Sequence, residues 1–263
     1  MSQKDNFYIG WQEQMSDSQW HFLRNRITLL FVGVLLLVGT VVWLQKPFNN
    51  HRFELGQVKE ITGRYYAKPL PMLVADANTL PKGLSNQIVL VGFGKFGAEG
   101  IVADMEREHG ALSGKKLRLA GTLIYGDNKT LFELTNEAAS LLEIVEDVPV
   151  QAPPFQARLG QELQGEILDP KCYFGAMKPG EGKIHKSCAI RCISGGIPPV
   201  FRQKKSGKKS TYDYYLLLDK DGSKINNQIL DYIAEPIQLT GETTAFMDWK
   251  VLYVDVSSIR IVE

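Results

Sequence analysis

Cysteine is scarce in this chain, with 3 among 263 residues, and histidine is nearly as rare, with 4. The cysteines form neither C-x-x-C nor C-x-x-C-H, which excludes a thioredoxin-like redox motif and covalent haem attachment. The G-x-S-x-G and H-E-x-x-H signatures of common hydrolases are missing as well. The sequence therefore leaves open whether this protein is an enzyme and favours a protein that is not.

The chain also has no excess of positive or negative charge. Lysine and arginine number 30 and aspartate and glutamate 29, which gives a formal net charge of +1. Nucleic-acid-binding proteins need a strongly positive surface, so we expect no nucleic-acid partner. Aromatic residues make up 10% and charged residues 22% of the chain, a composition typical of a folded protein with a large core.

One segment has no charge at all, from Ile27 to Leu44. At about 1.5 Å per residue, this run is long enough for a short transmembrane helix. It has no polar face, unlike the helices that cover the core of a soluble protein. Trp20 and Trp43 lie near its two ends, where aromatic rings favour the membrane interface. We therefore expect a single transmembrane helix over residues 27–44.

A cleaved signal peptide is the alternative to this anchor. Residues 45–48 contain no small-x-small cleavage site, and a long segment precedes the apolar run, which favours an uncleaved helix. Basic residues near the run number three before it and two after it, namely Lys4, Arg24 and Arg26 against Lys46 and Arg52. This bias predicts a cytoplasmic segment over residues 1–26. In a bacterium, the protein would be a single-pass inner-membrane protein with periplasmic C-terminal domains, where thiols are oxidised or metal-bound.

The rest of the chain repeats one order of elements, predicted from alternating hydrophobicity and turn signals. In the first copy, we expect strands at 58–66, 72–75 and 88–91, a helix at 99–109, and strands at 116–125 and within 131–144. In the second copy, we expect strands at 162–168, around 200–201 and at 214–218, a helix at 225–234, and strands at 237–243 and 249–262.

Strand, strand, strand, helix, strand, strand is the order of the OB-fold, which both copies resemble. Gly121 and Gly241 occupy equivalent positions, and bent barrel strands need glycine where backbones approach closely. We therefore predict a mainly β protein with short helices: the N-terminal transmembrane helix, then two OB-like barrels over residues 50–148 and 157–263. The proline-containing segment 146–156 separates the barrels. A single mixed β-sandwich is the alternative.

The segment Gly92–Gly97 has the pattern G-x-G-x-x-G after a predicted strand and before a predicted helix, as in dinucleotide-binding sites. No βαβ repeat surrounds it, because the neighbouring strands follow a pattern of hairpins. We therefore expect a glycine-rich turn and no bound nucleotide.

Other polar residues are expected at the surface. The run Arg202–Lys209 carries five basic residues, which predicts a solvated hairpin tip. A dock for an acidic protein or for anionic lipid head groups is the alternative. His21, His51 and His109 lie apart from the cysteines, and we expect them to be exposed.

The three cysteines and the remaining histidine lie together, with the spacing C-x12-H-x2-C-x3-C, at Cys172, His185, Cys188 and Cys192. If residues 185–192 are helical, the last three side chains share one face. This pattern predicts a tetrahedral Cys3His site for Zn²⁺ or Cu(I) within loop 169–199, to which Met177 could add a thioether. Basic neighbours would lower the thiol pKa values, namely Lys171, Lys178, Lys183, Lys186 and Arg191.

A disulfide is the alternative to a metal site. Cys172 could pair with Cys188 or Cys192 and stabilise the fold by about 3 kcal/mol. A bridge from Cys188 to Cys192 is disfavoured because residues one helical turn apart lie beyond disulfide reach. One thiol would remain unpaired, which a purely structural crosslink does not explain.

Three functions therefore remain open. The first is a binding or assembly protein that holds a transition metal or serves a metal- or haem-containing envelope enzyme. The second is a non-catalytic structural subunit of a membrane complex with a disulfide-closed loop, and the third is a thiol redox protein.

The same loop has a dense pattern outside its donors: Lys171-Cys172, Met177-Lys178-Pro179-Gly180, His185, Cys188-Ala189, Cys192 and Gly195-Gly196-Ile197-Pro198-Pro199. This pattern resembles a group of uncharacterised bacterial proteins that are anchored in the membrane. The resemblance covers this loop alone. It implies a bacterial envelope protein whose partners are the membrane and an envelope complex, and it implies no particular activity.

Overall fold

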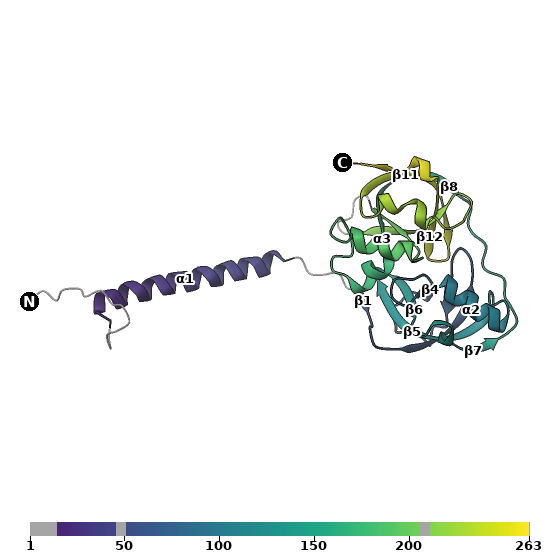
Figure 1. Cartoon of the computed structure of the whole chain (residues 1–263), viewed down its shortest axis with the longest axis horizontal. Helices are drawn as coiled ribbons and strands as arrows, with labels where there is room; N and C mark the ends of the chain where they lie inside the picture. Colours follow the sequence, from purple (N-terminus) through teal and green to yellow (C-terminus); the bar gives the residue numbers. More distant parts are fainter. Residues whose placement is uncertain (1–14, 46–50, 206–210, 263) are drawn as a thin grey trace, which may run out of the picture. The chain divides into compact units, whose positions relative to one another are not determined.

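The computed structural model describes residues 15–45, 51–205 and 211–262 (Figure 1). The chain divides into two units, residues 1–48 and a compact unit of residues 49–263. The first unit contains α1, Asp17–Leu44, which begins well before the predicted run at Ile27 and has no buried residue. An 18-residue window of α1 has a mean hydropathy of 2.7, so the helix is apolar and long enough to cross a membrane, a test that an N-terminal signal sequence also passes.

Five strands close into the first barrel: β2 Lys59–Tyr66, β3 Met72–Ala75, β4 Gln87–Gly92, β5 Lys116–Gly126 and β6 Lys129–Leu134. They pair in the order β2–β3–β4–β6–β5, and β5 pairs again with β2. Only the β4–β6 pair within this barrel is parallel. Shorter elements complete it: β1 Arg52–Phe53, α2 Glu99–His109, η1 Glu137–Ser140 and β7 Leu141–Glu146.

The second barrel has the same topology, with strands β8 Leu159–Leu168, β9 Val200–Lys204, β10 Tyr212–Asp219, β11 Pro236–Phe246 and β12 Trp249–Val254. They pair in the order β8–β9–β10–β12–β11, and β11 pairs again with β8. The parallel pair is β10–β12. Its shorter elements are the π-helical turn η2 Cys172–Ala176, α3 Lys186–Ser194, η3 Asn226–Gln228, η4 Leu230–Tyr232, η5 Val256–Ser258 and β13 Arg260–Ile261.

The predicted fold class is confirmed: an apolar N-terminal helix precedes two five-stranded barrels with OB-like topology. The two glycines have the predicted role, since a Cβ at Gly121 or Gly241 would overlap a carbonyl oxygen of the neighbouring strand. The helical stretch expected over 225–234 consists of two short 3-10 turns, η3 and η4, rather than one helix. The Asn226 amide there donates to the carbonyls of Ile193 and Ile197, which draws the segment onto the end of α3.

The two barrels share apolar packing in addition to their own interiors. One buried cluster takes Val89 and Leu131 from the first barrel and Phe174 and Trp249 from the second. We call this cluster the joint core. The indole Nε1 of Trp249 donates to the carbonyl of Gln87 across the joint, at 3.1 Å. Residues 49–263 are therefore one compact unit, and loops from both barrels meet at its joint.

The run of basic residues differs from the prediction at its first member. The Arg202 guanidinium, in β9, stacks on the rings of Tyr173 and Tyr212 and donates to Glu166 at 2.9 Å. Arg202 is therefore part of the packed structure rather than a solvated tip. The tip predicted around residues 206–210 lies outside the described residues.

Candidate metal centre

The first donors of the site lie where β8 ends. Asp169 and Pro170 follow this strand and start the helical turn η2, a sequence suited to a helix N-terminus. The Asp169 carboxylate is fully buried, and its Oδ1 accepts hydrogen bonds from the amides of Lys171, at 2.9 Å, and Cys172, at 3.3 Å. Its other oxygen, Oδ2, has no hydrogen-bond partner among the described residues. The turn therefore fixes Cys172 and leaves one buried carboxylate oxygen free.

The other donors come from α3, which carries Cys188 and Cys192 one turn apart. His185 is the residue before this helix, and its carbonyl accepts from the amide of Ala189 at 3.0 Å. His185 is 2% exposed, and its Nε2 has no hydrogen-bond partner among the described residues. Burial lowers the pKa of His185, which favours the neutral imidazole that metals bind.

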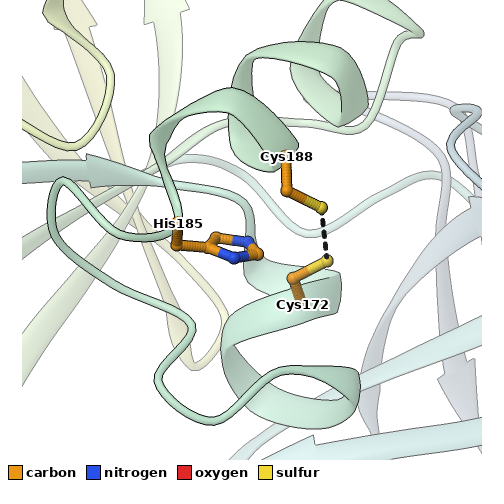
Figure 2. Close-up of side chains that lie close together, drawn as sticks. All are labelled: Cys172, His185 and Cys188. Atoms are coloured by element: carbon orange, nitrogen blue, oxygen red, sulfur yellow. Dashed lines mark hydrogen bonds between the residues drawn. The ribbon is translucent and has the colours of Figure 1, made fainter.

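These elements bring donor atoms from Cys172, His185 and Cys188 within 4.8 Å of one another. Figure 2 shows the three side chains converging, with the imidazole directed toward both sulfurs. The Sγ atoms of Cys172 and Cys188 lie 4.0 Å apart, and all three cysteines are free thiols. A disulfide needs about 2.05 Å between its sulfurs. Two thiolates on one tetrahedral Zn²⁺, at about 2.3 Å each, lie about 3.8 Å apart, close to the observed separation.

A second group of three donors shares Cys172 with the first. Asp169, Cys172 and Cys192 also place their donor atoms within 4.8 Å of one another, and all three residues are buried. Cys192 therefore reaches the cluster through Cys172 and Asp169. Sequence reasoning missed Asp169, although an aspartate before a proline at the start of a helix was a signal that its carboxylate would face this turn. We call Asp169, Cys172, His185, Cys188 and Cys192 the donor cluster.

The first barrel reaches the donor cluster through the glycine loop, residues 92–97. The exposed Lys95 of this loop places its Nζ 3.2 Å from the Sγ of Cys188 and 3.9 Å from the Sγ of Cys192. The hydrogen bond to Cys188 raises the pKa of Lys95. No local pattern in the sequence predicts this contact, because Lys95 and Cys188 belong to different barrels.

Glycines allow this approach between the barrels. The amide of Gly97 donates to the carbonyl of Gly195 at 3.2 Å. A Cβ at Gly97 would overlap the carbonyl of Gly196, and a Cβ at Gly195 would overlap the carbonyl of Lys95. The G-x-G-x-x-G pattern is thus a glycine-rich turn, as predicted, and it also packs against the end of α3.

A buried ion pair between Lys171 and Glu133 also contacts the glycine loop. The Lys171 ammonium donates to the carbonyls of Gly92 and Gly94, at 2.8 and 2.7 Å, and to Oε1 of Glu133 at 3.0 Å. Both side chains are almost fully buried. Lys171 therefore neutralises Glu133 and fixes the glycine loop beside the cysteine turn.

The predicted lowering of the thiol pKa values is wrong at Cys172. Its hydrogen-bonded contact with Cys192, followed by burial and the Asp169 carboxylate, raises the pKa of the Cys172 thiol. The positive charges expected nearby are engaged elsewhere: Lys171 pairs with Glu133, and Lys186 with Glu235 at 2.8 Å. Met177, which could add a thioether, has an exposed side chain after η2.

The expected exposure of His51 is also wrong, since this residue is 7% exposed. Its Nδ1 donates to the carbonyl of Tyr173 at 3.0 Å, and its Nε2 lies 3.2 Å from Oδ1 of Asp127. Tyr173 directly follows Cys172. His51 thus ties the start of the compact unit to the cysteine turn, a long-range contact that an isolated histidine in the sequence does not indicate.

Comparison with known proteins adds no relative: no family model, no curated protein and no solved structure matches this chain. The class of protein therefore follows from its own fold and site. It is a double OB-like barrel, preceded by an apolar helix, with a Cys/His/Asp cluster at the joint that could hold a metal ion.

Proposed function

We propose that this protein is a membrane-anchored metal-binding protein whose donor cluster takes up a thiophilic transition metal, Zn²⁺ or Cu(I). One observation carries the proposal: the buried His185 ring, whose Nε2 has no hydrogen-bond partner among the described residues, places a ring nitrogen within 4.8 Å of two free thiols. A buried polar atom without a hydrogen bond costs free energy, and coordination of a metal would satisfy it.

The donor set decides the class of metal. Thiolate and neutral imidazole ligands favour Zn²⁺ and Cu(I) over Mg²⁺ and Ca²⁺, which prefer oxygen. Cys172, Cys188 and His185 would supply three protein ligands, and Cys188 is only half-buried. Three protein ligands and one open position are typical of sites that bind a further molecule or exchange their metal.

The sequence around α1 and the pattern of the cysteine loop support a role in the cell envelope. We propose that α1 crosses the bacterial inner membrane once and that the barrels lie in the periplasm, with a role in binding or assembly for a metal- or haem-containing envelope enzyme. The basic residues before the apolar run and the loop pattern around the cysteines support this placement. An assembly protein needs a site whose metal can leave, and the half-buried Cys188 beside the exposed Lys95 offers one.

Metal analysis of the full chain tests the proposal. The chain would be purified in detergent without oxygen, loaded with Zn²⁺ or Cu(I), desalted and analysed by mass spectrometry of the metals. We expect bound metal, with at least a tenfold loss of affinity in His185→Ala and Cys188→Ser, because each removes one ligand of the same ion. His109→Ala, a surface change, is the matched control and should bind like the unmodified chain.

A structural disulfide is the second candidate, favoured by the 4.0 Å approach of the Cys172 and Cys188 sulfurs. Mass spectrometry of peptides from the unreduced chain distinguishes the two. A Cys172–Cys188 bridge in freshly isolated membranes, together with no metal uptake, would contradict the metal proposal and support the structural subunit. Free thiols that become protected from alkylation when metal is added would support the metal site.

A further inference from the structure

The donor cluster contains more ligands than one tetrahedral ion uses. Its five donors form two triads that share Cys172: Cys172 with His185 and Cys188, and Cys172 with Asp169 and Cys192. The ligands of one tetrahedral ion, at about 2.0–2.3 Å from the metal, lie within about 4 Å of one another. The donor atoms of each triad lie within 4.8 Å of one another, close to this limit. His185 and Cys188 thus belong to one triad and Asp169 and Cys192 to the other, and Cys172 belongs to both.

Asp169 gives an independent reason for a ligand on the inner side. Its carboxylate is fully buried, and both of its hydrogen bonds from backbone amides go to Oδ1. Oδ2 is left without a hydrogen-bond partner among the described residues. A carboxylate oxygen of Asp169 lies within 4.8 Å of two thiols that are themselves buried. A buried carboxylate is unfavourable unless a cation or donors satisfy it. The nearest buried ammonium group on this turn, that of Lys171, already pairs with Glu133.

We propose that the donor cluster is a two-ion centre in which the Cys172 thiolate bridges two Zn²⁺ ions. The outer ion takes Cys172, His185 and Cys188, and the inner ion takes Cys172, Cys192 and Asp169. This inference rests on the proposed metal-binding function and extends it by a second site. Three thiolates and one carboxylate carry four negative charges, and two divalent cations balance them inside the cluster.

The two sites differ in their access to solvent. Cys172, Cys192 and Ile197 form a buried cluster, against which Cys188 packs from the more exposed side. The ligands of the inner ion are all buried, whereas the outer ion has the half-buried Cys188 among its ligands. Lys95 contacts the sulfurs of both Cys188 and Cys192. We infer that the inner Zn²⁺ holds η2 and α3 together and that the outer Zn²⁺ is the exchangeable one.

Stoichiometry tests this arrangement. The full chain in detergent, stripped of metal and fully reduced, would be titrated with Zn²⁺ against a chromophoric chelator, and its zinc counted after desalting. We expect two ions per chain, released in two steps, the outer first. Asp169→Asn and Cys192→Ser should each retain one ion, as should His185→Ala, because each leaves one triad complete. Cys172→Ser should weaken both ions at least tenfold, and His109→Ala should retain two.

Asparagine at position 169 keeps an acceptor for the two backbone amides, so Asp169→Asn should fold, and circular dichroism checks that it does. If it does not fold, Cys192→Ser tests the same inner ion from the other element. One ion in the unmodified chain, unchanged in Asp169→Asn and in Cys192→Ser, would overturn the two-ion centre and leave the proposed function intact. No bound ion in the unmodified chain would overturn both.

Discussion

Lys171 and Glu133 show how single buried residues acquire fixed roles in this protein. Their side chains are 6% and 3% exposed, and the ammonium also satisfies two carbonyls of the glycine loop. The pair is far apart in sequence and links the cysteine turn to β6. The pair positions the cysteine turn beside β6, and removing one partner would leave an unpaired charge in the interior.

Glu133→Gln should therefore destabilise the compact unit by about 3–5 kcal/mol, because the Lys171 charge loses its buried partner. Urea unfolding of the full chain in detergent measures this change. Glu60→Gln, at an exposed pair with Arg118, is the control and should cost no more than about 1 kcal/mol. Equal effects of the two substitutions would contradict the importance of burial.

Asp127 is the residue whose ionisation should affect stability at low pH. Its hydrogen bond with His51, helped by that with Tyr214, holds the pKa of Asp127 below its usual 3.8. A carboxyl whose pKa is lower in the folded state stabilises the fold above its unfolded pKa, and this contribution is lost as the pH falls through the folded pKa. Stability should therefore decline below about pH 4, partly through this group.

Asp127→Asn should lower stability at neutral pH and should make it decline less below about pH 4 than in the unmodified chain. Asparagine suits the left-handed conformation of this position, with φ of 47°, so the turn between β5 and β6 should persist. Urea midpoints between pH 3 and 7 give the comparison, with Asp104→Asn on the surface of α2 as control. Parallel pH profiles for the unmodified and Asp127→Asn chains would exclude this role.

At the scale of elements, the meeting of the glycine loop with the end of α3 forms the site. Gly195 and Gly97 allow two backbones to come closer than side chains permit. Lys95 reaches Cys188 only because this contact exists. The glycine loop and α3 are thus in direct contact, although they belong to different barrels.

Gly195→Ala should destabilise the protein by about 1–3 kcal/mol, since its Cβ would overlap the Lys95 carbonyl and push the loop away. It should also weaken metal binding, because α3 carries two of the donors. Gly100→Ala is the matched control: nothing lies within 4 Å of its Cβ, and helix propensity should stabilise α2 by up to about 1 kcal/mol. Thermal unfolding and zinc titration of both variants measure these effects. A Gly195→Ala chain with unchanged stability and zinc affinity would contradict the close contact between the loop and α3.

At the scale of the whole molecule, the protein consists of an apolar helix and a compact double barrel. The joint core makes the two barrels one body, because Phe174 and Trp249 of the second pack against Val89 and Leu131 of the first. The donor cluster lies at this joint, so its geometry depends on the packing of both copies.

We expect α1 to remain part of the mature chain and to hold it in the membrane. The full chain should stay in the membrane fraction after a carbonate wash, and its intact mass should include residues 1–44. The physical reason is the uncharged run of α1, whose transfer out of the bilayer would expose apolar side chains to water. A soluble product that begins after residue 44 would show instead that α1 is a cleaved signal sequence.

Much of the fold was predictable because its signals are local. Alternating apolar residues, turn glycines and the repeated element order determined two OB-like barrels, and a single uncharged run determined α1. Met72–Ala75 is β3 with the predicted bounds. The helical stretch expected at 225–234 is divided into two short turns, where the Asn226 amide donates to the carbonyls of Ile193 and Ile197.

For the site, the sequence by itself determined which donors lie on the cysteine loop, because Cys188 and Cys192 are one helical turn apart. Only the tertiary structure decided that Asp169 joins the cluster, that Lys95 contacts Cys188 and that His51 hydrogen-bonds to the cysteine turn. These contacts depend on how the barrels pack and how β8 enters η2. No local pattern encodes the partner of a buried polar atom, because that partner is chosen by the whole fold.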